Sequence, residues 1–472
     1  MSEDSGLLRA AESDPRSGAT HLTRRQFLVL AGSASAAALL AACSPAGTPA
    51  PATGPSPAAA TSAPQVSTGG GELKFLNWTN FVPEMDTKFD DLAKAWGAQN
   101  KVTLTVEHIN INDIPTRRAA AVQAKSGPDM IWDTQNWPQF FADNLVDVSD
   151  IAGQLDKNIG GFFDVTRPYV TVDGKFRAIP AAFGTGTFIH RTDMFKQNNV
   201  TVPKTWDEFM KTAAIMKKFG KPFGQTLGHS FGDPPGFWYP WLWAWGGKEV
   251  EADGKTVAIN SPETITAIEK AVELYKTGLV EAGLAWDDSS NNRSYAGEEI
   301  SCTANGASIY FVAQRDAAKG DAIAKRVYEN SDHFVHPSGP AGQFSNLSPY
   351  SIGIMSYSKN AQAAKDFLLW LMQPAQYDAW MDSGKGYLQG TLKGYQNASA
   401  FKTDPKLKPF LEVITNGSGH WVGWPGPLSA QSFRVYTNYY IVDMFAKACA
   451  GEFTPKAAAA WAEGNLKTAY KA

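Results

Sequence analysis

Apolar residues along positions 72–137 follow two alternating spacings. Short apolar runs at 73–78, 102–106 and 129–133 predict three strands. Between the first two, Phe89, Leu92 and Trp96 share one helical face, in a helix that opens at a proline and ends at a glycine. A second helix is predicted at about 115–125. This order of strands and helices is typical of a parallel sheet with helices on its faces.

The alternation continues through the rest of the chain. Thr205 and Glu208 form a capping-box pattern that predicts a helix through Met216, and another helix is predicted from Ser261 to Gly278. Further elements are expected by their apolar runs: strands at 187–190, 307–311 and 350–355, and a helix at 360–372. The C-terminal third is predicted to be mainly helical, with a Gly/Pro/aromatic loop at 421–427. The fold class is therefore α/β.

The first 71 residues lack this pattern and read as targeting and attachment segments. Arg24 and Arg25 match a twin-arginine export signal, and the apolar stretch after them is shorter than the roughly 20 residues of a spanning helix. Leu-Ala-Ala-Cys43 then matches a lipobox, so residues 1–42 are predicted to be a lipoprotein signal peptide and Cys43 the lipidation site. The alternative is an ordinary apolar segment with a buried cysteine. The uncharged, Pro/Ala/Ser-rich segment that follows predicts a disordered tether over 43–71.

Length, charge and cysteine content narrow the class of protein. The 472 residues exceed the roughly 250–300 of a single core, which predicts two or more lobes. A net charge of −3 argues against a nucleic-acid partner, because such binders carry basic surfaces. Beyond Cys43, the two remaining cysteines, Cys302 and Cys449, either pair or stay as buried thiols. Fifteen tryptophans require a core, an interface or a ligand cleft to hold them.

Five ordered stretches resemble the bacterial ABC-transporter extracellular solute-binding proteins of family 1. They are the Val-Pro-Lys-Thr-Trp-Asp-Glu-Phe run at 202–209, Trp-Ala-Trp-Gly-Gly at 243–247 with Ile-Asn-Ser-Pro-Glu at 259–263, and the segments 295–310, 352–367 and 439–459. The resemblance covers 72–472 and implies a two-lobed periplasmic-binding-protein-like (type II) fold with a hinge and an interlobe cleft. The implied lobes are 72–182 plus 333–375, and 183–332 plus 376–472.

The resemblance also implies that the chain is not an enzyme and delivers a solute to ABC-transporter permease subunits. Its place would be outside the cell membrane, facing the periplasm or cell exterior and held only by its lipid anchor, as a monomer. Relatives of this kind bind mono- and oligosaccharides, polyols, polyamines or iron. Near-neutral charge and abundant tryptophan favour a carbohydrate here, and a polyamine or another non-sugar solute is the alternative. An amino acid or anion would need a cleft arginine, for which Arg177, Arg191 and Arg315 are candidates.

Candidate ligand-binding residues follow from the rule that loops after parallel strands face the crevice. A sugar needs aromatic faces for its C–H groups and amides or carboxylates for its hydroxyls. We expect ligand contacts from residues of these types: Asn77, Trp78, Asn80, Asp133, Gln135, Asn136, Trp137, Trp238, Trp241, Tyr310, Phe311, Gln314, Ser348, Trp421 and Trp424. The competing interpretation gives the aromatics to the core and the amides to turns and caps.

Enzyme chemistry is less favoured. Gly228–Gly232 fits the G-x-S-x-G pattern of a nucleophile elbow around Ser230, as in a secreted serine hydrolase. The elbow needs a helix after it, and two prolines at 234–235 argue against one. A secreted glycosidase is a further alternative. No cofactor or metal is expected, since His333 and His336 lie beside a proline and the Asp287-Asp288 pair is more consistent with solvated carboxylates.

Overall fold

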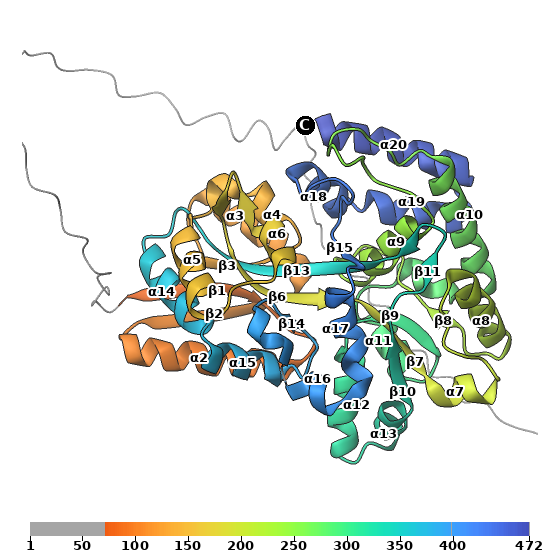
Figure 1. Ribbon diagram of the computed structural model, residues 1–472, viewed down its shortest axis with the longest axis horizontal. Helices are drawn as coiled ribbons and strands as arrows, with labels where there is room; N and C mark the ends of the chain where they lie inside the picture. The colour runs from red at the N-terminus through yellow and green to blue at the C-terminus, as the bar shows by residue number, and fades with distance from the viewer. Residues whose placement is uncertain (1–70, 398, 472) are drawn as a thin grey trace, which may run out of the picture. The chain divides into compact units, whose positions relative to one another are not determined.

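The computed structural model describes residues 71–397 and 399–471. The predicted signal peptide, Arg24, Arg25, Cys43 and all but the last residue of the predicted tether lie outside the described residues. Within them, every helix is too short or too polar to cross a membrane. The described residues belong to one compact unit, in which two separate sheets can be followed in Figure 1.

The first sheet has the strand order β14-β6-β13-β3-β1-β2, with β15 paired to β13. At one end, β1 runs parallel to both β2 and β3, and helices α2 and α3 make the connections, as predicted. Strand β13 is antiparallel to both β3 and β6. The bounds are β1 Glu72–Trp78, α2 Pro83–Asn100, β2 Thr103–Ile109, α3 Ile114–Ala124, β3 Met130–Thr134, β6 Ile179–Thr185, β13 Ser345–Ile354, β14 Gln389–Gly390 and β15 Gly419–His420.

The second sheet has the order β10-β7-β9-β8. Its central strand β7 is antiparallel to β10 and β9, while β8 runs parallel to β9. The bounds are β7 Thr187–Arg191, β8 Phe223–Gly224, β9 Cys302–Asn305 and β10 Ser331–Phe334. The chain passes from the first sheet to the second through Gly186 and returns through 335–344. Two sheets joined by such crossings make a two-lobed α/β fold.

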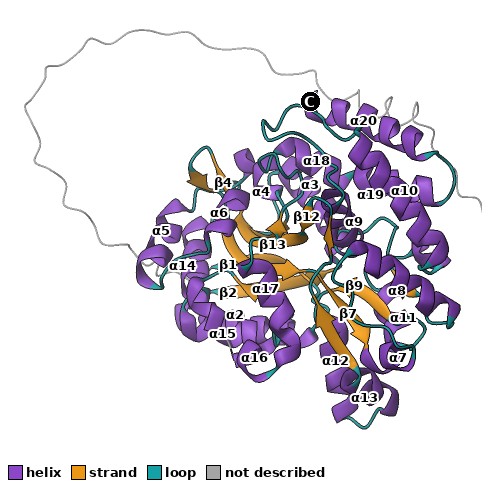
Figure 2. Cartoon of the chain, turned by 45° about the vertical axis from the view of Figure 1, so that its right-hand side comes forward, coloured by secondary structure: helices purple, strands orange, loops and turns teal. Residues whose placement is uncertain are grey.

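Helices cover both sheets, as Figure 2 shows. Two apolar cores are distinct: one centres on Trp78, Trp132 and Phe89, the other on the aromatic helix α9. The helices are α4 Trp137–Phe140, α5 Ser149–Asn158, α6 Arg167–Val170, α7 Thr192–Gln197, α8 Trp206–Lys218, α9 Asp233–Ala244, α10 Pro262–Thr277, α11 Ser290–Ala296, α12 Ser308–Ala318, α13 Ala322–Glu329, α14 Ala361–Leu371, α15 Pro374–Ser383, α16 Ser399–Thr403, α17 Lys408–Thr415, α18 Ala430–Thr437, α19 Tyr440–Cys449 and α20 Pro455–Lys471.

Local capping signals placed several helices correctly. The Thr205 hydroxyl accepts from the Glu208 backbone at 3.2 Å, and the Glu208 carboxylate accepts in return from the Thr205 backbone at 3.3 Å. This capping box starts α8 as predicted. The Ser261 side chain caps α10 by accepting from the Thr264 backbone N–H, and Pro262 occupies the first helical position. The predicted lobe boundaries remain a prediction.

Three sequence-based expectations about elements are wrong. The first helix does not end at its glycine, Gly97, but continues to Asn100. Residues 307–311 are not a strand but the start of α12, and the strand is the preceding Cys-Thr-Ala-Asn segment, β9. A short apolar run does not separate a buried strand from a buried helix. The prolines at 234–235 do not prevent a helix either, since they occupy the first turn of α9, where their missing N–H groups have no helical acceptor to lose.

Candidate functional site

A cavity lies where strand ends of both sheets converge. Trp78 ends β1, Thr134 ends β3, Thr185 ends β6 and Asn305 ends β9, and all four line it. The cavity has an open volume of about 80 Å³. The other lining residues are Phe81, Ile111, Gly184, Gly186, Phe231, Gly232, Asp233, Gly236, Asp288, Asn292, Ala304, Gly306, Ser308, Asn346, Ser348, Tyr350 and Tyr387. The space is therefore bounded by both sheets, as in an interlobe cleft.

One side of the cavity is an aromatic wall formed by Trp78, Tyr350 and Tyr387. The rings of Trp78 and Tyr350 are stacked, with centroids 5.6 Å apart and planes 17° from parallel. The ring centroid of Tyr387 lies 6.4 Å from that of Trp78. Trp132 stacks on Trp78, with ring centroids 6.3 Å apart. The Trp78 indole N–H is buried with no hydrogen-bond partner among the described residues. The wall combines an apolar surface with a free donor, which suits a ring that carries hydroxyls.

Asp288 belongs to a cap that starts helix α9. Its carboxylate accepts hydrogen bonds from the Ser230 hydroxyl at 2.6 Å, the Gly232 N–H at 3.0 Å and the Asp233 N–H at 2.8 Å. Gly232, at the N-cap position, has no side chain that could bind these N–H groups, so Asp288 supplies the acceptor from a distant loop. Three donors hold this carboxylate, and the expectation that it is solvated is wrong.

Asp233 faces the same cavity with neutral partners. Its carboxylate lies 3.5 Å from the Asn305 amide nitrogen and hydrogen-bonds with the Asn291 side chain. Burial raises the pKa of Asp233 well above its usual range, and the neighbouring Asp288 raises it further. The described residues that line the cavity include no Lys, Arg or His. The cavity therefore holds two carboxylates without a protein cation.

Amides and hydroxyls complete the lining. Asn305 donates to Asn292 at 2.6 Å and accepts from the Ser308 hydroxyl at 3.1 Å, so these three side chains fix each other's orientation. On the opposite side, the Asn346 side-chain oxygen and the Thr185 hydroxyl are buried with no partner within the described chain. Buried polar groups are normally satisfied, so these atoms are candidates for contacts with a bound solute.

The loop after β3 meets α18 beside the cavity. The Asn136 amide donates to the Ser429 carbonyl at 2.6 Å and to the Ser432 hydroxyl at 2.8 Å. Phe433 stacks on Phe140 at 4.7 Å and meets the edge of Trp137 at 5.9 Å. Asn136 and Trp137 thus join the first sheet to a helix that packs against α19 and α20.

The predicted ligand-binding residues are spread over several environments. Trp78 and Ser348 line the cavity, and Asn80 lines a second hollow that shares Phe81, Ile111 and Asp288 with it. Gln135 touches the rim, because its amide donates to Ser348 at 3.3 Å. The ligand-binding role of each remains a prediction.

The other candidates on the first sheet have internal partners. Asn77 accepts from the backbone N–H of Trp78 at 3.0 Å. Asp133 is fully buried in an ion pair with Arg118, whose guanidinium lies 5.2 Å from the Trp137 ring. Burial raises the pKa of Asp133 to about 7, against the opposing effect of Arg118.

The remaining aromatic and amide candidates lie outside the residues that line the cavity. Trp238 and Trp241 are buried in α9 and donate to the carbonyls of Thr226 and Ala267, both at 2.9 Å. On α12, Tyr310 donates to Asp404 at 2.7 Å, Gln314 bonds Tyr328, and Phe311 borders a separate surface hollow. In the 421–427 loop, Trp424 stacks on His420 at 4.4 Å and Trp421 is partly buried.

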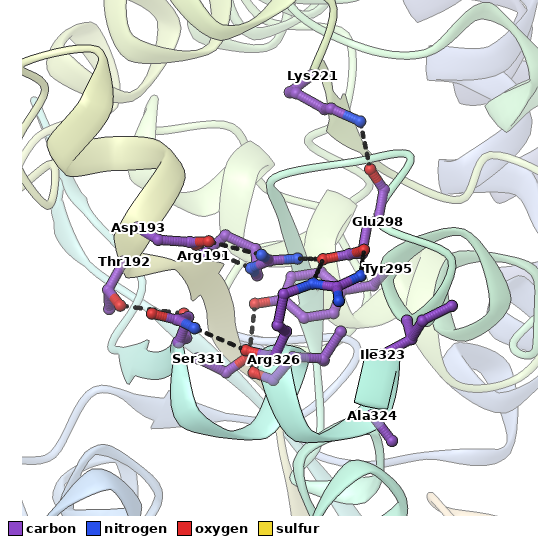
Figure 3. A network of polar contacts seen from close by, with 12 residues as sticks. Arg191, Thr192, Asp193, Lys221, Tyr295, Glu298, Ile323, Ala324, Arg326 and Ser331 are labelled. Carbon is purple, nitrogen blue, oxygen red and sulfur yellow. Dashed lines mark hydrogen bonds and ion pairs between the residues drawn. The ribbon is translucent and has the colours of Figure 1, made fainter. Parts of the chain in front are cut away.

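The candidate arginines for an anion site are engaged elsewhere or lie outside the lining. Arg191 ends β7 at the edge opposite Thr187 and pairs with Asp193 at 2.6 Å and Glu298 at 2.9 Å, in a network that Figure 3 shows. Arg326 binds the same Glu298. Arg315 pairs with Asp316, and Arg177 is not among the residues that line the cavity.

Features considered for catalysis have structural roles. Ser230 donates to Asp288, and within the described chain none of its hydrogen bonds is to a histidine. The nearest sequence neighbour, His229, binds Asp443 at 2.7 Å. Burial lowers the pKa of His333 to about 3 and of His336 to about 4. Cys302 and Cys449 are both free, buried thiols, and no cluster able to hold a metal is found among the described residues.

Comparisons with known proteins place this architecture. A family model described as bacterial extracellular solute-binding protein matches residues 91–409, more than half of the chain. The chain belongs to this family. As a member of an extracellular binding family, it is a solute receptor and not an enzyme. Among curated protein sequences, no significant match is found.

Solved structures of solute-binding proteins share the fold. The GacH receptor of Streptomyces glaucescens, solved unliganded and with acarbose, is 19% identical with a TM-score of 0.71, covering 85% of this chain and 99% of its own. A tagatose-bound solute-binding protein of Thermotoga lettingae is 20% identical with a TM-score of 0.72, and the match covers 85% of this chain and 100% of its own. A sugar transporter protein of Arthrobacter chlorophenolicus with bound laminaribiose is 16% identical with a TM-score of 0.73, and the match covers 84% of this chain and 99% of its own. The family member described here therefore has the two-lobed binding-protein fold.

Sequence reasoning missed most of the lining. The missed residues come from segments that converge only in three dimensions, such as Asp233, Asp288 and Tyr387. Asp233 carried one usable signal, because an aspartate directly before two prolines is a pattern of a helix start. Tyr387 and Asn346 carried none.

Proposed function

We propose that this chain is the exported solute receptor of an ABC importer and captures a small carbohydrate by closure of its two lobes. The observation that carries the proposal is the cavity between the two sheets, where an aromatic wall opposes carboxylates, amides and hydroxyls. Trp78 and Tyr350 line the cavity with apolar ring surface for C–H groups, and Asn346, Thr185 and the Trp78 N–H offer unpaired polar atoms to hydroxyls. The sugar-bound structural relatives support the choice of solute.

Delivery and anchoring belong to the same proposal. The lipobox at Cys43 and the twin-arginine pattern support export and attachment to the membrane surface by a lipid, with a permease as the partner and a monomer as the receptor. Intact-mass spectrometry after expression in a bacterial host tests the anchor. A chain that begins at an acylated Cys43 supports it, and a chain that retains residues 1–42 contradicts it.

Isothermal calorimetry with the purified full-length chain tests the function. We expect mono- or disaccharides to bind, and Trp78→Ala to weaken that binding by about 10- to 100-fold, since the loss of one well-packed aromatic contact is worth about 1–3 kcal/mol. Trp461→Ala is the matched control, because Trp461 packs on Tyr440 and Phe453 in α20, away from the cavity. Binding of no sugar, or equal losses in both variants, would contradict the proposal.

Binding of a linear polyamine is the second candidate function, and one observation favours it. Asp233 and Asp288 place two carboxylates in the cavity without a basic lining residue. Calorimetry with putrescine in place of sugars distinguishes this candidate.

A further inference from the structure

We propose that the solute carries a positive charge beside its hydroxyls, as an amino sugar does, and that its ammonium group lies between Asp233 and the aromatic wall. This inference rests on the proposed carbohydrate function and narrows the class of carbohydrate. It follows from the distribution of charge, aromatic faces and unpaired polar atoms around the cavity.

The two carboxylates of the cavity, Asp288 and Asp233, differ in their partners. Asp288 accepts three hydrogen bonds from the chain itself, whereas the partners of Asp233 are two neutral amides, Asn291 and Asn305. A buried carboxylate without a cation is unfavourable unless something compensates it. The chain compensates such charges elsewhere, since Arg118 pairs with Asp133. At Asp233 the described lining has no cation, so a cationic ligand is the group that would complete it.

The aromatic wall favours the same charge. A cation over an aromatic face is attracted by the negative charge density of the ring, most strongly by tryptophan. Trp78, Tyr350 and Tyr387 present such rings within one cavity. Burial raises the pKa of the Tyr350 hydroxyl and Asp288 and Asp233 raise it further, so the wall lies in the field of both carboxylates.

The polar lining distinguishes an amino sugar from a plain polyamine. Asn292, Asn305 and Ser308 form one hydrogen-bonded row. The Asn346 oxygen, the Thr185 hydroxyl and the Trp78 N–H are buried without partners in the described structure. A linear diamine offers no hydroxyl to these groups, whereas a hydroxylated ring satisfies donors and acceptors together.

The open space of the cavity, about 80 Å³, is small, which favours a single ring over an oligosaccharide. The adjoining hollow bounded by Asn80, Asn110 and Asn112 leaves room for a longer ligand at the mouth.

Calorimetry with matched sugar pairs tests the inference on the full-length chain. The probes are glucose and glucosamine, galactose and galactosamine, and mannose and mannosamine at pH 7.5, with putrescine as a separate arm. We expect the amine of at least one pair to bind about 10- to 100-fold more tightly than its neutral partner, the range of one charge-assisted hydrogen bond. At a pH low enough to protonate Asp233 the preference should disappear, because a neutral carboxyl no longer attracts an ammonium group; Asp287, Asp288, Tyr350 and Tyr387 are the other titratable groups facing this region.

Asp233→Asn is the decisive variant, because the amide keeps an acceptor oxygen and the size of the side chain but removes the charge. It should abolish the preference for the amine and leave neutral-sugar affinity within about threefold. Asp366→Asn, the same change on surface helix α14, should leave both affinities unchanged. Neutral sugars that bind as tightly as their amines would overturn this inference and leave the proposed function intact. Binding of putrescine alone, or of none of the probes, would overturn both.

Discussion

Asp133 in the first lobe is a fully buried carboxylate, whereas Asp233 in the second is partly exposed and lines the cavity, and their surroundings differ. Asp133 is the last residue but one of β3 and forms an ion pair with Arg118, which is itself fully buried and packed over the rings of Trp137 and Phe141. Asp233 begins α9 near a second carboxylate, and its partners are the neutral amides of Asn291 and Asn305. The first charge has its counter-charge within the chain, and the second does not.

The presence or absence of a cation in the chain distinguishes a structural carboxylate, such as Asp133, from one whose counter-charge a ligand would supply. Residue type and position after a strand do not reveal it, because Asp133 satisfies both criteria for a ligand-binding residue. The partner decides: Arg118 comes from α3, fifteen residues earlier in the chain. For Asp233 the described residues offer the amides of Asn291 and Asn305, and the cavity lining offers no cation. We therefore expect that removing Arg118 destabilises the fold, whereas removing the charge of Asp233 stabilises it.

The larger effect is expected at the ion pair. Arg118→Met should lower the free energy of unfolding at pH 7 by about 3–5 kcal/mol, because it leaves Asp133 buried and uncompensated. Methionine keeps most of the apolar stem that packs on Trp137, so the lost charge dominates. Urea unfolding followed by tryptophan fluorescence measures the change.

A double variant checks the cause. In Arg118→Met with Asp133→Asn, the orphaned charge is gone, so at least half of the lost stability should return. If the losses of stability simply add in the double variant, the two side chains act independently, and Arg118 does not compensate the charge of Asp133.

The elements of the fold were predictable where their signals are local. The Thr205 and Ser261 caps and the apolar spacing around Phe89 depend on neighbours within one helix, and the structure confirms those helices. The apolar run at 307–311 failed because burial on all sides gives neither a helical nor a strand period. The preceding β9 was missed for the same reason, since its polar Thr303 and Asn305 are buried inside a sheet.

The site was predictable only at its strand ends. Trp78 and Ser348 line the cavity, and both were chosen because they flank apolar strands. Trp238 and Trp241 come from a run in which almost every residue is buried, so spacing could not tell the core face of α9 from the cleft. Asp288 and Tyr387 reach the cavity from loops after long intervening segments, and no local pattern marks such convergence.

The smaller effect is expected at Asp233, and it stabilises. Without ligand, Asp233→Asn should raise the free energy of unfolding at pH 8 by on the order of 1 kcal/mol, because it removes a charge that desolvation disfavours and that the neighbouring Asp288 repels. The helix N-terminus favours a negative charge at this position and opposes the gain, but Asp288 already binds its N–H groups.

The pH dependence gives this last prediction its sign. The folded-state pKa of Asp233 is raised above the ordinary 3.8, so the wild-type chain binds this proton more tightly folded than unfolded. Its stability therefore declines as pH rises above about 4 through the raised pKa, while an asparagine undergoes no such loss. The gain of Asp233→Asn over wild type should be near zero at pH 4 and grow toward pH 8 in thermal unfolding, with Asp366→Asn showing no such trend. A variant that is less stable than wild type at pH 8 would mean that Asp233 has a stabilising partner in the chain, and its charge would then be structural like that of Asp133.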